Sequence, residues 1–426
     1  MEVGQSTGEA DRRPVSLLDL PDELIVAIFR KVHAAIAQES RVRRGFLVPT
    51  SGVVVNKRIF QLAFPIWASA IRTPERWSDC NAFFGHLGLD LRIRPFVCHL
   101  EVFLARGHDK IICAGTAAFT GLTSLSVSLD KDLVEYPQQL IALLRQLNHL
   151  KNLKVAERGG FTNLDLNLDR DIPSLRSFDT ANPHLLDQLC HNPPSRLRRL
   201  TVPRATSLAG VIIPWRAAEH LHLSLPAAFD TPDALLQSLQ VVFSTSDENS
   251  PLRLRHLTLK WDVLYDRRGN PRTYFAYTHF KALLSILQSS QLEHLELAYV
   301  PSLRLAPEGL ILPTVRVLTL CGPCNLSEPV NLHGLHTLLT NFPSVTSLHL
   351  HEFTLDSPYT SSVYAITSDS ALPFPLRFPI LNSLLTHLPS TTILDFRFRD
   401  NAQHELRWRR NSVKDPFERE HWEVLV

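Results

Sequence analysis

The sequence has few of the features that mark a secreted, membrane-spanning or nucleic-acid-binding protein. Its 426 residues include only six cysteines, and residues 1–14 are polar and charged without an apolar core segment. Both features favour a reducing compartment, so we expect a cytoplasmic and/or nuclear protein. No apolar run approaches the ~20 residues that span a bilayer, and the net charge of +2 lacks the excess of a nucleic-acid binder. We therefore expect neither membrane nor nucleic acid as a partner.

Motifs of catalysis are equally scarce. The sequence has no glycine-rich phosphate loop and no Gly-x-Ser-x-Gly elbow, so we expect no enzyme activity and no cofactor. Cys321 and Cys324 match the spacing of a thiol oxidoreductase motif, in which the first thiolate is the nucleophile. That motif normally precedes a long helix, whereas here it leads into a predicted loop. A thiol oxidoreductase using Cys321 and Cys324 stays open as an alternative.

Residues 15–67 hold the most specific pattern in the chain. Pro21 suits the first turn of a helix, and Asp22 and Glu23 complement the positive end of the helix dipole. Apolar residues then recur with a helical period, at Leu24, Ile25, Ile28, Phe29 and Val32. Residues 53–67 predict a further amphipathic helix that ends near Pro65. A unit of about 50 residues is marginal alone, so we expect it to pack on a partner or on the rest of the chain.

The pattern Leu-Pro-Asp-Glu-Leu, followed by Val-x-Lys-Arg and an apolar helix, resembles the F-box. The resemblance implies a three-helix module that binds the Skp-type adaptor of cullin–RING ubiquitin ligases. It implies these adaptor-binding residues: Leu20, Pro21, Leu24, Ile25, Ile28, Phe29, Val54, Val55 and Phe60. The stretch between Val32 and Ser51 is longer and more polar than is usual in the family. The alternative is an ordinary helical hairpin that caps a larger domain.

From about residue 95 the chain repeats one short pattern: apolar, two of any type, apolar, one of any type, apolar. The central positions are 100, 125, 153, 178, 200, 221, 257, 295, 318, 348 and 394. The shorter separations fit the leucine-rich repeat period of about 20–29 residues, and the longer ones include helical patterns at 234–240 and 280–287. We expect an α/β fold in which an irregular leucine-rich-repeat-like solenoid carries parallel strands on its concave face. An α/β domain with several parallel strands is the alternative.

Side chains between the repeated leucines should point outward, because they alternate along a strand. The candidate substrate-binding residues on this face are Arg199, His220, His222, His256, His294, Glu296 and His349. Arg199, His220, His256 and His294 share one register, so they should stack across strands about 4.8 Å apart. Protonated imidazoles this close repel, which should lower their pKa and allow anion binding or a pH response. A solvated face without a ligand is the alternative, and no metal is expected because this column lacks a carboxylate.

These patterns together predict a non-catalytic substrate receptor of an SCF-type ubiquitin ligase. The expected partners are a Skp-type adaptor, a cullin scaffold and an unidentified protein substrate. The expected regions are a disordered leader (1–14), the F-box-like module (15–67), a connector (68–94), the solenoid (95–398) and a cap or tail (399–426). A repeat scaffold whose N-terminal helices only cap the solenoid is the further alternative.

Overall fold

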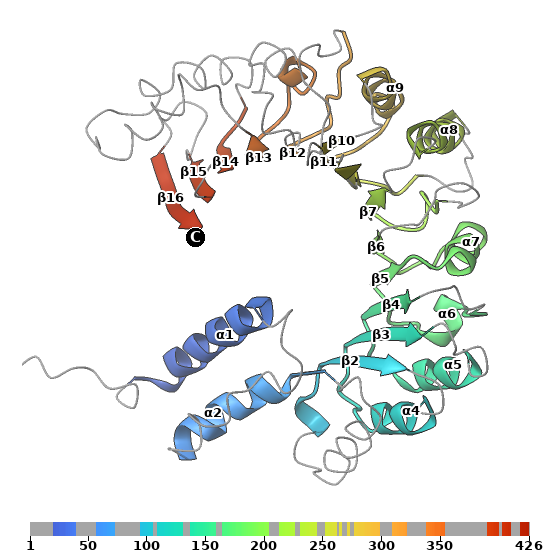
Figure 1. Ribbon diagram of the computed structural model, residues 1–426, viewed down its shortest axis with the longest axis vertical. Coiled ribbons are helices and arrows are strands. Elements are labelled where there is room, and N and C mark those ends of the chain that lie inside the picture. The colour runs from blue at the N-terminus through green and yellow to red at the C-terminus, as the bar shows by residue number, and fades with distance from the viewer. Residues whose placement is uncertain are drawn as a thin grey trace, which may run out of the picture. The chain divides into compact units, whose positions relative to one another are not determined.

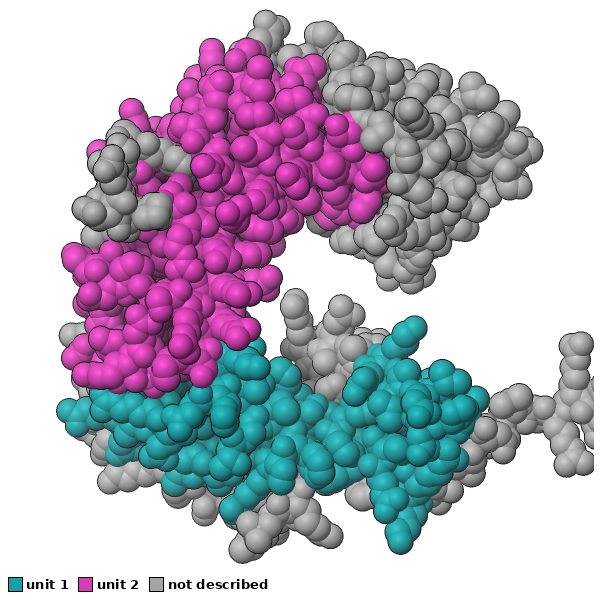
Figure 2. Space-filling view, turned by 180° about the vertical axis from the view of Figure 1, so that it is seen from behind, with its two compact units in different colours: residues 1–153, 158–160 teal, residues 154–157, 161–426 magenta. Residues whose placement is uncertain are grey.

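The computed structural model describes seventeen stretches of the chain, whose helices and strands are drawn in Figure 1. They are residues 20–39, 57–72, 94–104, 109–130, 137–158, 164–203, 213–225, 231–244, 252–261, 264–265, 271–272, 277–298, 309–321, 338–353, 390–399, 403–409 and 418–425. The chain divides into two compact units, coloured separately in Figure 2. Unit 1 comprises residues 1–153 and 158–160, and unit 2 comprises residues 154–157 and 161–426.

Unit 1 begins with two helices and continues with alternating strands and helices. Its elements are α1 (Asp22–Glu39), α2 (Lys57–Ala68), β1 (Ala70–Arg72), the 3-10 helix η3 (Arg94–Phe96), β2 (His99–Leu104), α4 (Asp109–Ala117), β3 (Ser124–Asp130) and α5 (Pro137–Gln146). Strands β1, β2 and β3 pair in parallel, and Leu100 lies opposite both Ile71 and Leu125. These three side chains are buried, so the core of unit 1 includes a row of aligned apolar residues.

Unit 2 repeats the plan of a strand followed by a helix or loop. The division between the units falls within β4 (Asn152–Arg158). The other elements are α6 (Leu168–Asp171), β5 (Ser177–Thr180), α7 (Pro183–His191), β6 (Arg199–Val202), β7 (His220–Leu225), α8 (Thr231–Ser244), β8 (His256–Trp261), β9 (Leu264–Tyr265), β10 (Pro271–Arg272), α9 (Tyr277–Leu287), β11 (His294–Ala298), β12 (Val317–Cys321), β13 (Ser347–Phe353), β14 (Ile393–Arg399), β15 (Gln403–Arg409) and β16 (Glu418–Leu425). Helices α7, α8 and α9 all lie on the same side of the strands (Figure 1).

The leucine pattern sets the register of unit 2. Strands β5 to β8 and β11 to β14 pair in parallel in chain order, and the central residues of neighbouring repeats lie directly opposite one another. Leu200, Leu257, Leu295 and Leu318 are all fully buried. A shift of one residue would turn every leucine to the opposite face, so this alignment fixes which residues face outward.

A recurring backbone contact joins most repeats of unit 2 to the one before. In six strands, β6, β8 and β11 to β14, the first residue and the residue before it both donate their N–H to one carbonyl of the preceding repeat. For example, Arg255 and His256 share the carbonyl of Glu219 at 2.9 and 3.0 Å, and Glu293 and His294 share that of Arg255. The same geometry at these strands shows that each strand belongs to a structural repeat, and that each repeat contacts its neighbours.

Helix α7 shows how a repeat turns back after its strand. Asn182 caps the helix, because its side-chain oxygen accepts from the N–H groups of His184 (2.9 Å) and Leu185 (3.2 Å). Pro183 follows at the first helical position, where it needs no N–H partner. Leu185, Leu186 and Leu189 are buried. The polar cap and the leucines together place α7 over the apolar face of the sheet.

The end of unit 2 leaves the parallel plan. Strand β15 pairs antiparallel with β14, and β16 pairs antiparallel with β15. These strands fall in the region predicted as a cap or tail. The antiparallel pairing covers the edge of β14 that would otherwise be open.

The α/β class and the repeated parallel strands are confirmed in both units, and the helices predicted at 234–240 and 280–287 are α8 and α9. Two details differ from expectation. Helix α2 continues through Pro65 to Ala68, and β1 was not predicted. The described residues between 15 and 67 contain two helices, and residues 40–56 lie outside the described part, as does the predicted leader 1–14.

Candidate functional site

Helix α1 in unit 1 exposes a stripe of large apolar side chains. Leu24 is 52% exposed, Ile28 38% and Val32 44%. Their spacing of four residues puts them on one side of the helix. Single exposed apolar residues are ordinary, whereas three in a row along one helix form a continuous hydrophobic surface. We call these three residues the α1 stripe.

The side of α1 that carries Ile25, next to the stripe, packs inside unit 1. Ile25 of α1 and Ala63 of α2 are fully buried. The Arg58 guanidinium donates to the Asp22 carboxylate at 2.6 and 2.9 Å and to the Leu20 carbonyl at 3.0 Å. Because this ion pair is exposed, it contributes at most about 1 kcal/mol, and its main effect is to fix the start of α1 beside α2.

The predicted adaptor-binding residues therefore divide into two groups. Pro21, Leu24 and Ile28 are exposed, Leu20 and Phe29 are half-buried, and Ile25 is buried. The side chain of Ile25 is thus part of the interior, not of the α1 stripe. Phe60 lies in α2, and Val54 and Val55 lie outside the described residues.

The predicted column of basic residues is present on unit 2. Arg199, His220, His256 and His294 are direct register partners on β6, β7, β8 and β11. The rings of His220 and His256 stack with centroids 3.8 Å apart, and His256 and His294 follow at 5.4 Å with a tilt of 45°. The predicted stacking is confirmed for His220 and His256, whereas His294 is tilted against His256. We call His220, His256 and His294 the histidine stack.

Partial burial decides the charge of the histidine stack. Burial lowers the pKa of His220, His256 and His294 below the usual value for histidine. Repulsion from His256 lowers the pKa of both neighbours further, and Arg199 lowers that of His220 and His256. The predicted direction of the pKa shift is right. Burial lowers the pKa more than does the repulsion between imidazoles on which the prediction relied. The stack is therefore neutral at pH 7.

A second outward column runs beside the first. In register order it contains Asp179, Thr201, His222, Thr258, Glu296, Thr319, His349 and Asp395. Thr258 donates its hydroxyl to Glu296 at 3.1 Å, and Lys154 lies 3.4 Å from Asp179. Burial lowers the pKa of His222, and the charge of Glu296 opposes that effect. This column therefore combines carboxylates, imidazoles and hydroxyl groups along one face of the sheet.

The second column ends in a cluster that sequence reasoning missed. His349 Nδ1 lies 3.0 Å from Asp395 Oδ2, and His351 Nε2 lies 3.7 Å from the same oxygen. Asp395 is 1% exposed, whereas the two histidine side chains are about one-fifth exposed. We call His349, His351 and Asp395 the His–Asp cluster. Asp395 was predicted to face outward, but its contact with two histidines depends on pairing between strands 46 positions apart.

Ser347, His349 and Asp395 also form a hydrogen-bonded chain in the order found in serine hydrolases. Ser347 Oγ lies 2.8 Å from His349 Nε2, on the ring opposite Asp395. However, Ser347 is only 8% exposed, and its N–H already donates to the Arg316 carbonyl at 3.1 Å. Where the N–H of the nucleophile forms part of an oxyanion hole, that donor must be available, and here it is already engaged. The contacts with Ser347 and Asp395 hold the His349 ring in place.

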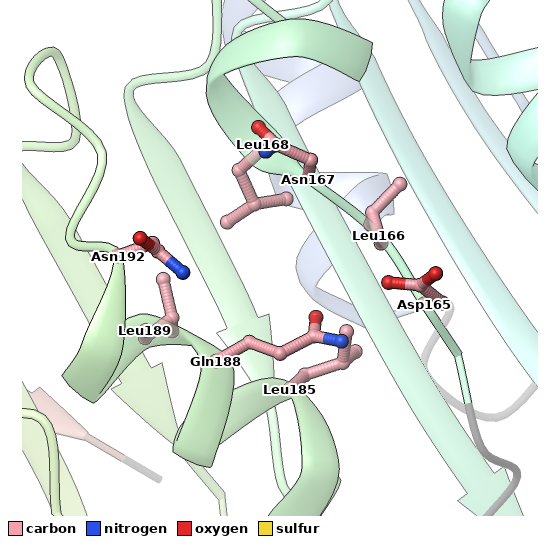
Figure 3. A pocket seen from close by; sticks show the side chains of 8 residues that line it. All are labelled: Asp165, Leu166, Asn167, Leu168, Leu185, Gln188, Leu189 and Asn192. Carbon is pink, nitrogen blue, oxygen red and sulfur yellow. The ribbon is translucent and has the colours of Figure 1, made fainter.

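A pocket in unit 2 lies between residues 165–168 and helix α7 (Figure 3). It is lined by Asp165, Leu166, Asn167, Leu168, Leu185, Gln188, Leu189 and Asn192. Its volume is about 110 Å³, whereas small-molecule sites usually measure about 300–1,000 Å³. The pocket is too small for a cofactor or a metabolite-sized ligand.

The structure describes only the first cysteine of the predicted thiol motif. Cys321 is the last residue of the parallel strand β12, and Cys324 lies outside the described residues. Burial raises the pKa of the Cys190 thiol on α7 to about 12. A thiol with so high a pKa is a poor nucleophile at neutral pH.

Comparison with known proteins gives no family for this chain. No protein-family model matches it, and no curated protein matches it. Among the described helices, none combines the length and apolar character that crossing a membrane requires.

Proposed function

We propose that this chain is the substrate-recognition subunit of an SCF-type cullin–RING ubiquitin ligase. Helix α1 docks a Skp-type adaptor, which links the chain to a cullin scaffold. The polar columns of unit 2 bind a protein substrate. The α1 stripe is the observation that carries this proposal, because it coincides with the segment whose sequence resembles the F-box.

The α1 stripe has the geometry of a helix that binds in the groove of a protein partner. Such helices present apolar anchors at spacings of three, four and seven residues, and the stripe offers three anchors at spacings of four. Complete burial of one large aliphatic side chain contributes about 1.5–3 kcal/mol. Three side chains that are about half exposed would then contribute roughly 3 kcal/mol on docking. Ile25 and Ala63 keep α1 packed on α2, so the stripe is held in place before a partner arrives.

The substrate surface would act through binding alone. The outward columns of unit 2 combine a cation at Arg199, imidazoles in the histidine stack and a carboxylate at Glu296. A surface with both charges and many donors can distinguish protein ligands by complementarity. Holding the substrate near a ubiquitin-charged enzyme raises the effective concentration of the reacting groups. On this proposal the chain itself makes and breaks no bond.

Adaptor binding by purified proteins tests the proposal. Leu24→Asp combined with Ile28→Asp should abolish capture of a Skp-type adaptor, because two charges would enter a buried apolar contact. Arg30→Asp is the matched control, since Arg30 is exposed on the same helix about 120° from the stripe. The control should bind as the unchanged chain does. If the unchanged chain captures no adaptor, it is a repeat scaffold and not a ligase subunit.

A further inference from the structure

We infer that the His–Asp cluster of unit 2 is a binding site for one divalent transition-metal ion of the zinc type. The site takes His349 and His351 from β13 and Asp395 from β14. Their candidate ligand atoms all lie within 4.8 Å of one another. Nothing in the proposed substrate receptor function requires this site, so the two proposals stand or fall separately.

The distances match those between ligands of one zinc ion. Zinc binds imidazole nitrogen and carboxylate oxygen at about 2.0–2.2 Å, so two ligand atoms of a tetrahedral site are about 3.4 Å apart. The two contacts to Asp395 Oδ2, at 3.0 Å from His349 and 3.7 Å from His351, lie on either side of that value. Only small side-chain movements are needed to place a metal ion between the three groups.

The chemistry of the donors also fits. Two imidazoles and one carboxylate form the ligand set of several catalytic zinc and iron sites, which keep at least one position open. The buried Nε2 of His351 makes no hydrogen bond, although it is 3.7 Å from the carboxylate. A metal ion would give this nitrogen a partner. The two imidazoles are about one-fifth exposed, so the open position can face solvent or a bound protein.

Ser347 supports the geometry from outside the ligand set. For His349 to bind a metal through Nδ1, the neutral ring must carry its single proton on Nε2 and not on Nδ1. Ser347 Oγ lies 2.8 Å from Nε2 and can accept that proton as a hydrogen bond. Partners of this kind orient metal-binding histidines in known sites. The register also places Arg407 of β15 opposite Asp395, so the test below includes Arg407 as a competing cation.

Zinc titration of the full-length, chelator-treated chain tests the inference. The unchanged chain should bind one Zn²⁺ at this cluster, and Co²⁺ in its place should show the visible absorption of a tetrahedral ion. The double variant His349→Gln, His351→Gln should weaken zinc binding at least tenfold and lose the cobalt spectrum. The matched control is His220→Gln with His256→Gln, which removes two histidines from the same face of the sheet. It should keep the site, and Arg407→Gln should keep or strengthen it.

Three results would overturn the inference: no binding by the unchanged chain, equal weakening by both double variants, or undiminished binding by the cluster variant. Circular dichroism of each variant shows whether it has folded. If the cluster variant does not fold, Ser347→Ala decides, because it leaves all three ligands in place. It should weaken zinc binding by about tenfold, and unchanged affinity in Ser347→Ala would then count against the site.

Discussion

The histidine stack and the His–Asp cluster lie on the same face of unit 2 and differ mainly in their neighbours. In the stack, strand register brings together three histidines from three strands, whereas in the cluster it brings Asp395 of β14 to two histidines of β13. In the stack, His256 has a histidine on either side and Arg199 farther along the column. In the cluster, two histidines meet one buried carboxylate. The first arrangement disfavours positive charge, whereas the second places two imidazoles beside a buried carboxylate.

This difference shows that residue type and register alone do not decide the chemistry of a repeat surface. The stack and the cluster occupy neighbouring outward columns, whose positions the leucines fix by their own burial. What changes is the residue that the next strand supplies. A histidine beside another histidine loses protons through burial and repulsion, whereas a histidine beside Asp395 gains a hydrogen bond of 3.0 Å. The chemistry of the surface is therefore set pair by pair.

Asp395→Asn should give the largest effect, because it removes the charge that both cluster histidines contact. We expect a loss of about 2 kcal/mol in the free energy of unfolding, measured by urea denaturation. Asp179→Asn is the matched control at the other end of the second column. Burial raises the pKa of Asp179, which shows that the folded chain disfavours its charge. Asp179→Asn should therefore change stability by less than about 0.5 kcal/mol. Equal losses of stability in the two variants would show that the two histidines add nothing to the effect of Asp395.

Sequence reasoning predicted the repeats because their signal is local and repeated. The burial of Leu200, Leu257 and Leu295, and the stacking of the histidines between them, both follow from one short pattern. A residue's face could be read from alternation along the strand without knowing the rest of the fold.

The His–Asp cluster could not be predicted in the same way. It requires a precise contact between His349 and Asp395, across the longest separation between predicted repeats. The pattern at Leu394 was also the weakest of the series, with Thr391 and Phe396 in place of leucines. Alternation showed that Asp395 faces outward, but not that it is buried or that His351 also reaches it. Strand β1 was missed for a related reason, because three residues carry too little pattern to detect.

A second prediction concerns Arg199, the cation next to the histidine stack, which is replaced by a carboxylate. Arg199→Glu should raise the pKa of His220, because Arg199 lowers it by charge repulsion and a carboxylate would attract the proton instead. The histidine ring signals in an NMR titration measure this directly. Arg198→Glu is the control, since Arg198 is equally exposed and adjacent in the chain but faces away from the column by alternation. If both variants shift His220 alike, the effect comes from overall charge and not from register.

The smallest expected effect is on the pH dependence of stability. A folded-state pKa below the unfolded value means that the unfolded chain binds more protons, so stability rises with pH through that interval. The contribution of the histidine stack to folding stability is complete above the unfolded pKa of about 6.5. It is lost as the pH falls through the lowered pKa values of the folded state. His256→Gln should therefore flatten the decline in melting temperature between about pH 6.5 and pH 5. His191→Gln on α7, whose side chain is 69% exposed, should leave that decline unchanged. Because His256 lies between two other histidines, its removal also relieves their repulsion, so the change should exceed that of deleting one isolated titrating group.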